Sequence, residues 1–360
     1  MSDKRIHWMD GVRGLAALAV AFGHLLGSQN SGWPQTILSA SSLPIINLPW
    51  NGSAAVSLFF VLSGFVLTLA IKKNARFDIQ WIAGFVIGRV SRIAFPFWGA
   101  LLLSAVFLFT SYNPDFWIAS EKNWMAKHWY NGEHVLDFWL YQALLLLPNT
   151  EHTIIPPGWT LTVELQISIV LPLIFYFLIR KPVLTVTSAL VIGVFLHQTF
   201  VFHFLLGMLL ALYYPTVMKI LVPLSPTIKW LILLSGLFLL SFTWQPYGKF
   251  GEVLRWCING SGAVAILAIG GSMTFITSLL SRKLLQFLGR ISYSLYLIHF
   301  TIYLILIPYL TQTSLPQTAI LVIAIATAIL SATLFHYLVE VPSITAGRYL
   351  RQRISSGSST

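Results

Sequence analysis

Two ionisable residues of one apolar segment have a spacing that suits chemistry inside a membrane. Arg13 and His24 stand eleven positions apart, which at about 100° per residue puts them within about 20° of one helix face. Along the helix they are about 16 Å apart, roughly half the thickness of a hydrocarbon core. The sequence therefore predicts a cation near the inner surface and a deep imidazole that acts as a general base. Alternatively, Arg13 reaches the headgroups and His24 bonds a neighbouring helix.

Apart from Asp10 at the edge of the first span, Glu164 is the one acidic residue inside a predicted span, just after the segment Pro156–Val163. An ionised group there costs at least about 2.5–3.5 kcal/mol on insertion scales, so it must be protonated or paired. The span assignment puts it in the outer half, near the level of His24. Because a buried carboxylate commonly orients and charges a catalytic imidazole, we predict that Glu164 serves His24. A structural bond to another helix is the alternative.

Arg89 and Arg92 stand at i and i+3, on one face of a helix turn at the inner end of a predicted span. Two guanidinium groups offer forked donors that match phosphate oxygens. With Arg13 they predict a cytoplasmic site for a phosphate-rich ligand. Ordinary anchoring of positive charge at the inner surface is the alternative.

A polar stripe follows one helix face near the C-terminus, where Ser292, Tyr296 and His299 stand at i, i+4 and i+7. Such groups in lipid face protein or water, so the stripe is expected to line the same cavity, with His299 as a second catalytic or acceptor-positioning residue. Ser63 is a possible nucleophile, but Ser63 and Gly64 together are more typical of close helix packing. His336 is assigned a structural or interfacial role.

The elements that position these residues must be membrane helices. The 360 residues are 56% hydrophobic and 9% charged, with a mean hydropathy of +0.77, whereas a soluble domain has about 25% charged residues. This excludes a soluble protein, a coiled coil or a repeat solenoid. The net charge of +11 reflects inner-surface cations rather than nucleic-acid binding. Cys257 is the single cysteine, so neither an internal disulfide nor a cysteine metal site is expected, and no metal is predicted.

The predicted fold is an all-α polytopic bundle of about ten transmembrane helices. The apolar spans are 9–27, 53–71, 93–110, 160–179, 183–197, 199–214, 228–244, 257–280, 291–310 and 317–338. The shorter stretch 135–147 is expected at the interface or as a re-entrant segment. With both termini cytoplasmic, four of the 22 Lys and Arg fall outside: Lys122, Lys127, Lys249 and Arg255. That bias fixes the predicted orientation.

Six motifs, in chain order, resemble those of the acyltransferase 3 family of membrane O-acyltransferases. They are Asp10–Arg13 with His24, Phe59–Phe65, Arg89–Pro96, Trp159–Glu164, Phe287–His299 and His336–Pro342. The resemblance covers residues 1–345 as a transmembrane acyltransferase domain and leaves 346–360 as a basic, then Ser-rich, cytoplasmic tail. In the tryptophan motif, Thr160 replaces a family Ser and keeps the hydroxyl. Asp10 and Trp159 join the residues expected around the substrate cavity.

The resemblance implies an enzyme of the bacterial inner membrane that moves an acyl group, usually acetyl, from cytoplasmic acyl-CoA to a hydroxyl of a surface glycan or similar acceptor. Arg13, Arg89 and Arg92 would hold the CoA phosphates, while His24, oriented by Glu164, would deprotonate the acceptor. Direct transfer is the simpler version, and an acyl-His or acyl-Ser relay stays open. The rival interpretation is a transporter or flippase for a lipid-linked or anionic substrate. The oligomeric state is not predicted.

Overall fold

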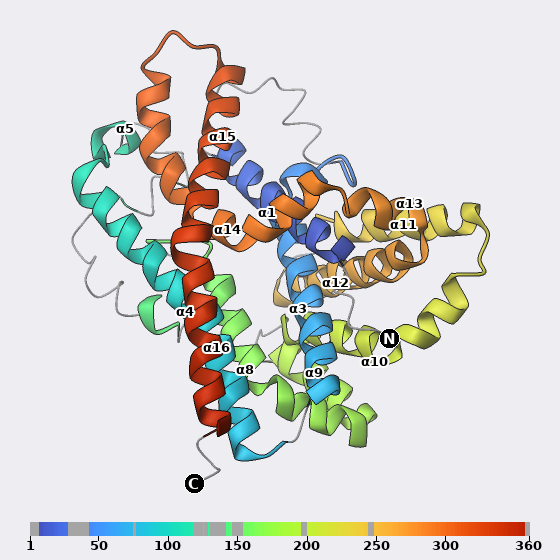
Figure 1. Cartoon of the computed structure of the whole chain (residues 1–360). Helices are drawn as coiled ribbons and strands as arrows, with labels where there is room; N and C mark the ends of the chain where they lie inside the picture. Colours follow the sequence, from blue (N-terminus) through green and yellow to red (C-terminus); the bar gives the residue numbers. More distant parts are fainter. Residues whose placement is uncertain are drawn as a thin grey trace. The chain divides into compact units, whose positions relative to one another are not determined.

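The computed structural model describes residues 7–27, 43–74, 77–118, 125, 129, 142–145, 154–195, 200–243 and 248–356. Within these ranges every regular element is a helix and no strand occurs (Figure 1). A helix satisfies its own backbone hydrogen bonds, which a chain surrounded by lipid requires. The all-α prediction is therefore confirmed for the described residues.

Eight helices in the described part of the chain are long and apolar enough to cross a membrane: His7–Leu26, Gly52–Lys73, Ile79–Thr110, Gly158–Arg180, Phe200–Leu221, Gly251–Ser272, Lys283–Thr311 and Gln317–Ile354. The expected spans 183–197 and 228–244 correspond to the shorter helices α9 (Pro182–Phe195) and α11 (Pro226–Leu240). At about 1.5 Å per residue these reach about 21–23 Å, less than the hydrocarbon thickness of about 30 Å. Ten crossings and the cytoplasmic side of both termini therefore stay predictions.

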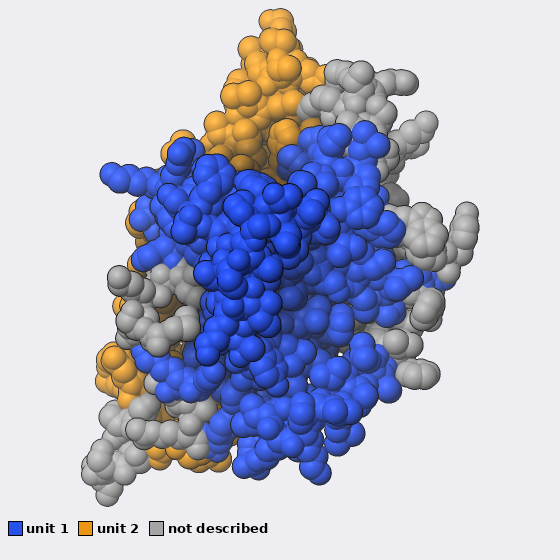
Figure 2. All heavy atoms as spheres, turned by 90° about the vertical axis from the view of Figure 1, so that its right-hand side faces the viewer, with its two compact units in different colours: residues 1–16, 39–77, 167–290 blue, residues 17–38, 78–166, 291–360 orange. Residues whose placement is uncertain are grey.

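The chain divides into two compact units (Figure 2). Unit 1 contains residues 1–16, 39–77 and 167–290, and unit 2 contains residues 17–38, 78–166 and 291–360. Three helices contribute residues to both units: α1 (His7–Gly27), α8 (Gly158–Arg180) and α14 (Lys283–Thr311).

Glycines bring two helices of unit 1, α3 (Gly52–Asn74) and α10 (Phe200–Leu221), into backbone contact. A methyl group added at Gly64 would strike the backbone of Phe204, and one added at Gly207 would strike the backbone of α3. Small residues at a crossing are the usual means by which helices associate in lipid. Unit 1 also contains η1 (Leu48–Trp50), α9, α11, α12 (Lys249–Ser272) and α13 (Thr274–Leu280).

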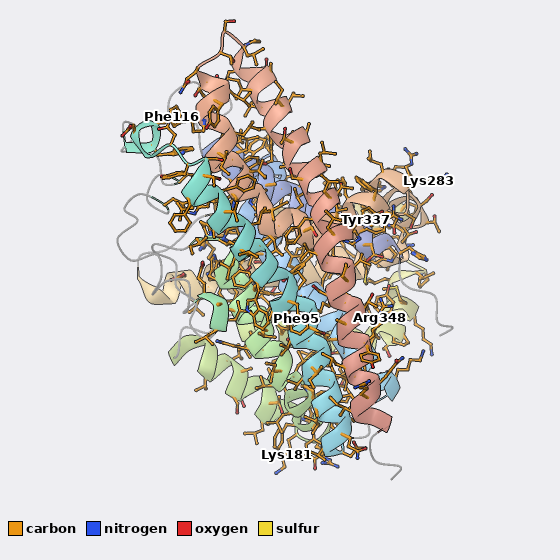
Figure 3. The ribbon with its side chains drawn as sticks, turned by 60° about the vertical axis from the view of Figure 1, so that its left-hand side comes forward. Phe95, Phe116, Lys181, Lys283, Tyr337 and Arg348 are labelled. Atoms are coloured by element: carbon orange, nitrogen blue, oxygen red, sulfur yellow. The ribbon has the colours of Figure 1, made fainter. Side chains whose placement is uncertain are left out.

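In unit 2, α4 (Ile79–Thr110) runs antiparallel to a continuous helical segment, α15 (Gln317–Phe335), η2 (His336–Glu340) and α16 (Val341–Ser356). Positions rise along α4 as they fall along the partner, in the contacts of Gly84 with Arg351, Ser91 with Gly347, and Gly99 with Val339. Figure 3 shows the two helices side by side, with Phe95 labelled on α4 and Arg348 on α16. Residues 346–356, expected as a tail, thus continue α16. Unit 2 also contains α5 (Pro114–Ile118).

The turn that leads into α8 is buried in unit 2. Gln142 holds it: Nε2 donates to the carbonyl oxygen of Ile155 at 3.2 Å, and Oε1 accepts from the N–H groups of Ile154 and Ile155 at 3.0 and 3.3 Å. Helix α8 therefore begins among other side chains rather than at a free surface. Of the expected interfacial or re-entrant stretch 135–147, only residues 142–145 lie within the described residues.

Candidate active site

The imidazoles of His24 on α1 and His299 on α14 form the centre of the candidate site, within unit 2. Nδ1 of His24 lies 2.8 Å from Nε2 of His299, and the ring planes are 18° apart. The edge of Phe300 packs against the His24 ring. His299 has an exposed fraction of 0%, whereas His24 is half-buried. Residues 275 positions apart thus act as one hydrogen-bonded unit.

The hydrogen-bond partners indicate which nitrogen atoms carry protons. Nδ1 of His299 lies 2.7 Å from the carbonyl oxygen of Leu295, which can only accept, so this nitrogen carries a proton. In a neutral His299, Nε2 then accepts, and His24 donates through its Nδ1–H. Nε2 of a neutral His24 consequently holds the lone pair. The pair is therefore arranged as an oriented base whose proton-accepting atom is Nε2 of His24.

Glu164 forms an ion pair with Arg89, whose Nη2 donates to Oε1 at 2.9 Å. The exposed fraction of Arg89 is 8%, and its Nε–H is buried with no hydrogen-bond partner among the described residues. Arg89 is therefore not at a free surface. The span assignment had put Glu164 in the outer half and Arg89 at the inner surface. The structure brings them together because α8 begins inside the protein.

Four other residues predicted to bind the donor or line the cavity are divided between the two units. Arg92 is exposed on α4 in unit 2, whereas Asp10, Arg13 and Ser63 belong to unit 1. In unit 1, a methyl group added at Gly14 would strike the backbone at Gly289, so the segment Asp10–Gly14 packs tightly on α14. Asp10 is buried, and Arg13 and Ser63 are half-buried.

Tyr296 and Thr160 connect α14 to the start of α8. The Tyr296 hydroxyl lies 2.6 Å from Oγ1 of Thr160, which in turn donates to the carbonyl oxygen of Pro157 at 2.9 Å. A hydroxyl at position 160 is thus used structurally, which explains why Thr can stand for Ser in this motif. Ser292 is buried on the same helix, and Trp159 beside Thr160 is half-buried.

Unit 2 contains a buried carboxylate, Glu340, that the sequence analysis did not single out. Oε2 of Glu340 accepts from Oγ of Ser294 at 2.6 Å and lies 2.8 Å from Nδ1 of His336. These contacts hold the π-helical turn η2 against α14, and they agree with the structural role expected for His336. The sequence could have indicated this, because Glu340 stands within the motif His336–Pro342 and a carboxylate in an apolar helix needs a partner.

Tyr303 was also missed by the sequence analysis. It follows Ser292 by eleven positions, the spacing that puts Arg13 and His24 on one helix face, so the polar stripe continues through it. The stripe predicted from the sequence ends at His299 and does not include Tyr303. The described part of the chain contains no group of three His, Cys, Asp or Glu side chains that could hold a metal ion.

The chain matches the family model of the acyltransferase 3 group, described as an acyltransferase domain, over residues 6–337. It is 23% identical over 388 aligned residues to O-acetyltransferase OatA of Staphylococcus aureus, in strains NCTC 8325 / PS 47, COL and MRSA252. The alignment covers 95% of this chain but 57% of each relative, so the chain spans little more than half of their length. No solved structure matches the chain.

The match covers the described helices from α1 to α15 and includes both histidines of the pair. The resemblance to the family is thereby confirmed, and the chain belongs to the acyltransferase 3 family.

Proposed function

We propose that this chain is an integral-membrane O-acetyltransferase of the bacterial inner membrane. It would move acetyl from cytoplasmic acetyl-CoA to a hydroxyl of a cell-surface glycan. Family membership and the curated relatives, which are named O-acetyltransferases, support the reaction class. The observation that carries the proposal is the hydrogen bond between His24 and His299, which leaves the lone pair on Nε2 of His24. An alcohol needs such a base before it can attack a thioester.

The proposed transfer is direct. Nε2 of His24 takes the proton of the acceptor hydroxyl as its oxygen attacks the thioester carbonyl carbon. The resulting imidazolium keeps its Nδ1–H bond to His299, which becomes charge-assisted and so stronger. The C–S bond then breaks, and the CoA thiolate leaves with the proton that His24 returns. His299 would act through His24 as a positioning residue.

The arginines would serve the donor end of the site. Arg92 is exposed and keeps its guanidinium accessible to phosphate oxygens. Arg89 is buried against Glu164, and its Nε–H, which has no partner among the described residues, is a donor that a ligand could use. Glu164 would thus fix the Arg89 guanidinium in place. Arg13, on α1 in unit 1, is the third arginine proposed for the phosphates.

The test is acetyl transfer by the purified protein from radiolabelled acetyl-CoA to surface polysaccharide isolated from unmodified cells, counted as alkali-labile acetate. His24→Ala should lower the turnover by about 10²–10⁴, the usual contribution of a general base. His7→Ala is the matched control, because His7 is exposed at the start of the same helix. Wild-type turnover by His24→Ala would remove the base from the mechanism. Movement of substrate across vesicles with the thioester intact would favour a transporter.

A further inference from the structure

Helix α14 presents a polar side chain at nearly every turn, at Tyr293, Tyr296, His299 and Tyr303. The first three each have a protein partner, namely the Ile93 carbonyl oxygen at 2.7 Å, Thr160 Oγ1 at 2.6 Å and His24 Nδ1 at 2.8 Å. These three contacts all lie within unit 2. The fourth side chain differs from them.

Tyr303 has an exposed fraction of 0%, yet its hydroxyl has no hydrogen-bond partner in the described part of the chain. Its ring contacts the ring of His299, with centroids 5.8 Å apart and planes at 70°. Buried hydroxyls nearly always have partners, because an unsatisfied one destabilises the fold. A hydroxyl without a partner among the described residues, one helical turn from the His299 that orients the candidate base, therefore needs a reason.

The order of the side chains along α14 suggests what the missing partner is. Tyr293 bonds to Ile93, which is one turn of α4 beyond Arg89, so the arginine end of the site lies at the start of this series. His299 is about 9 Å further along α14, and Tyr303 about 15 Å further, at roughly 1.5 Å per residue. Along α14, Tyr303 thus lies beyond His299, on the side away from Arg89. The donor phosphates would bind at the Arg89 end.

We propose that the Tyr303 hydroxyl is part of the acceptor-binding site and hydrogen-bonds the hydroxylic acceptor beside the oxygen that His24 deprotonates. This inference rests on the proposed function. A phenol donates one hydrogen bond and accepts another, which suits a neutral compound with neighbouring hydroxyl groups, such as a sugar residue. The partner that the described part of the chain lacks would then arrive with the substrate.

Tyr303→Phe removes the hydroxyl and keeps the ring. In cells, alkali-labile acetate on the surface polysaccharide should fall by about tenfold or more, the effect of losing one buried hydrogen bond to the substrate. In detergent, the Tm of the purified variant should equal or exceed that of the wild type, because the hydroxyl has no partner among the described residues to lose. The affinity for acetyl-CoA, measured by calorimetry, should stay unchanged because the donor binds at the other end.

Two tyrosines of the same helix are controls. Tyr309→Phe should leave the acetate level unchanged, because Tyr309 is exposed. Tyr296→Phe should lower the Tm, because its hydroxyl has a partner in Thr160. Wild-type acetate levels in Tyr303→Phe, a lowered Tm, or weaker binding of acetyl-CoA would each overturn the inference while the proposed function stands. Absence of acetate with the wild-type protein would instead overturn the proposed function.

Discussion

His24 and His299 share one hydrogen bond, with 2.8 Å between Nδ1 and Nε2, and the carbonyl oxygen of Leu295 holds the far side of His299. The sequence predicts that Glu164 orients His24. In the structure, His299 bonds His24 directly and fixes its tautomer. In this arrangement His299 is a neutral acceptor and transfers no proton. His299 therefore contributes by orienting His24, and variants of His299 can test this separately from the proton transfer by His24.

Replacing His299 by Phe should lower kcat by about 10², because His24 loses the acceptor that selects its tautomer. His299→Gln should recover much of this loss, since its amide oxygen can accept from the Nδ1–H of His24. The double variant with His24→Ala should be no slower than His24→Ala alone, because the two residues act as one unit. Steady-state kinetics with acetyl-CoA measure all three variants. Multiplicative losses in the double variant would mean that the imidazoles act independently.

The ion pair of Arg89 and Glu164 can be tested by its stability. Glu164→Gln leaves the Arg89 charge buried without its counter-ion and should destabilise the protein by about 3 kcal/mol, measured by unfolding in detergent. The double variant Arg89→Met with Glu164→Leu should recover most of that stability, because an apolar pair can replace a buried ion pair. It should not recover affinity for acetyl-CoA. If Glu164→Gln kept its stability and lost only turnover, Glu164 would act in the chemistry, as the sequence predicted.

The helices were predictable from the sequence because a lipid-spanning segment must be apolar and must satisfy its own backbone. Hydropathy located the long helices but made two of them too short. It began one span at residue 93, whereas α4 begins at Ile79, and ended another at residue 338, whereas the helical segment continues through α16. These extensions are polar, and contact between α4 and α16 stabilises them, which a hydropathy window cannot detect.

The candidate site was only partly predictable. Spacing along one helix identified His24 and the stripe of Ser292, Tyr296 and His299, because helical periodicity is local. Pairing between helices is not local: Glu164 is bonded to Arg89 because a buried turn sets the depth of α8. Spacing along the sequence does not predict which residues of different helices come into contact. That the Tyr303 hydroxyl has no partner among the described residues is likewise visible only once the helices are packed.

Ser294 should contribute to stability through its bond to the buried carboxylate of Glu340. Ser294→Ala deprives that carboxylate of one of its two donors and should lower the free energy of unfolding by about 1.5–3 kcal/mol, the range for hydrogen bonds to charged groups. Ser343→Ala is a suitable control, because that hydroxyl donates to the carbonyl oxygen of Val339, one turn earlier in the same continuous helical segment. Chemical unfolding in detergent measures both variants. Equal stability of the two would show that His336 alone satisfies the carboxylate.

The glycine contact between α3 and α10 gives the sharpest test of packing. Gly64→Ala would push a methyl group against the backbone of Phe204, which cannot move aside as a flexible side chain can. We expect a loss of about 1–3 kcal/mol, as for overpacked cores. Gly88→Ala is the matched control, because the added methyl at this position of α4 meets open space and alanine is the better helix former by about 1 kcal/mol. The Tm should therefore fall for Gly64→Ala and rise slightly for Gly88→Ala, and a rise in both would mean that α3 and α10 do not pack through this glycine.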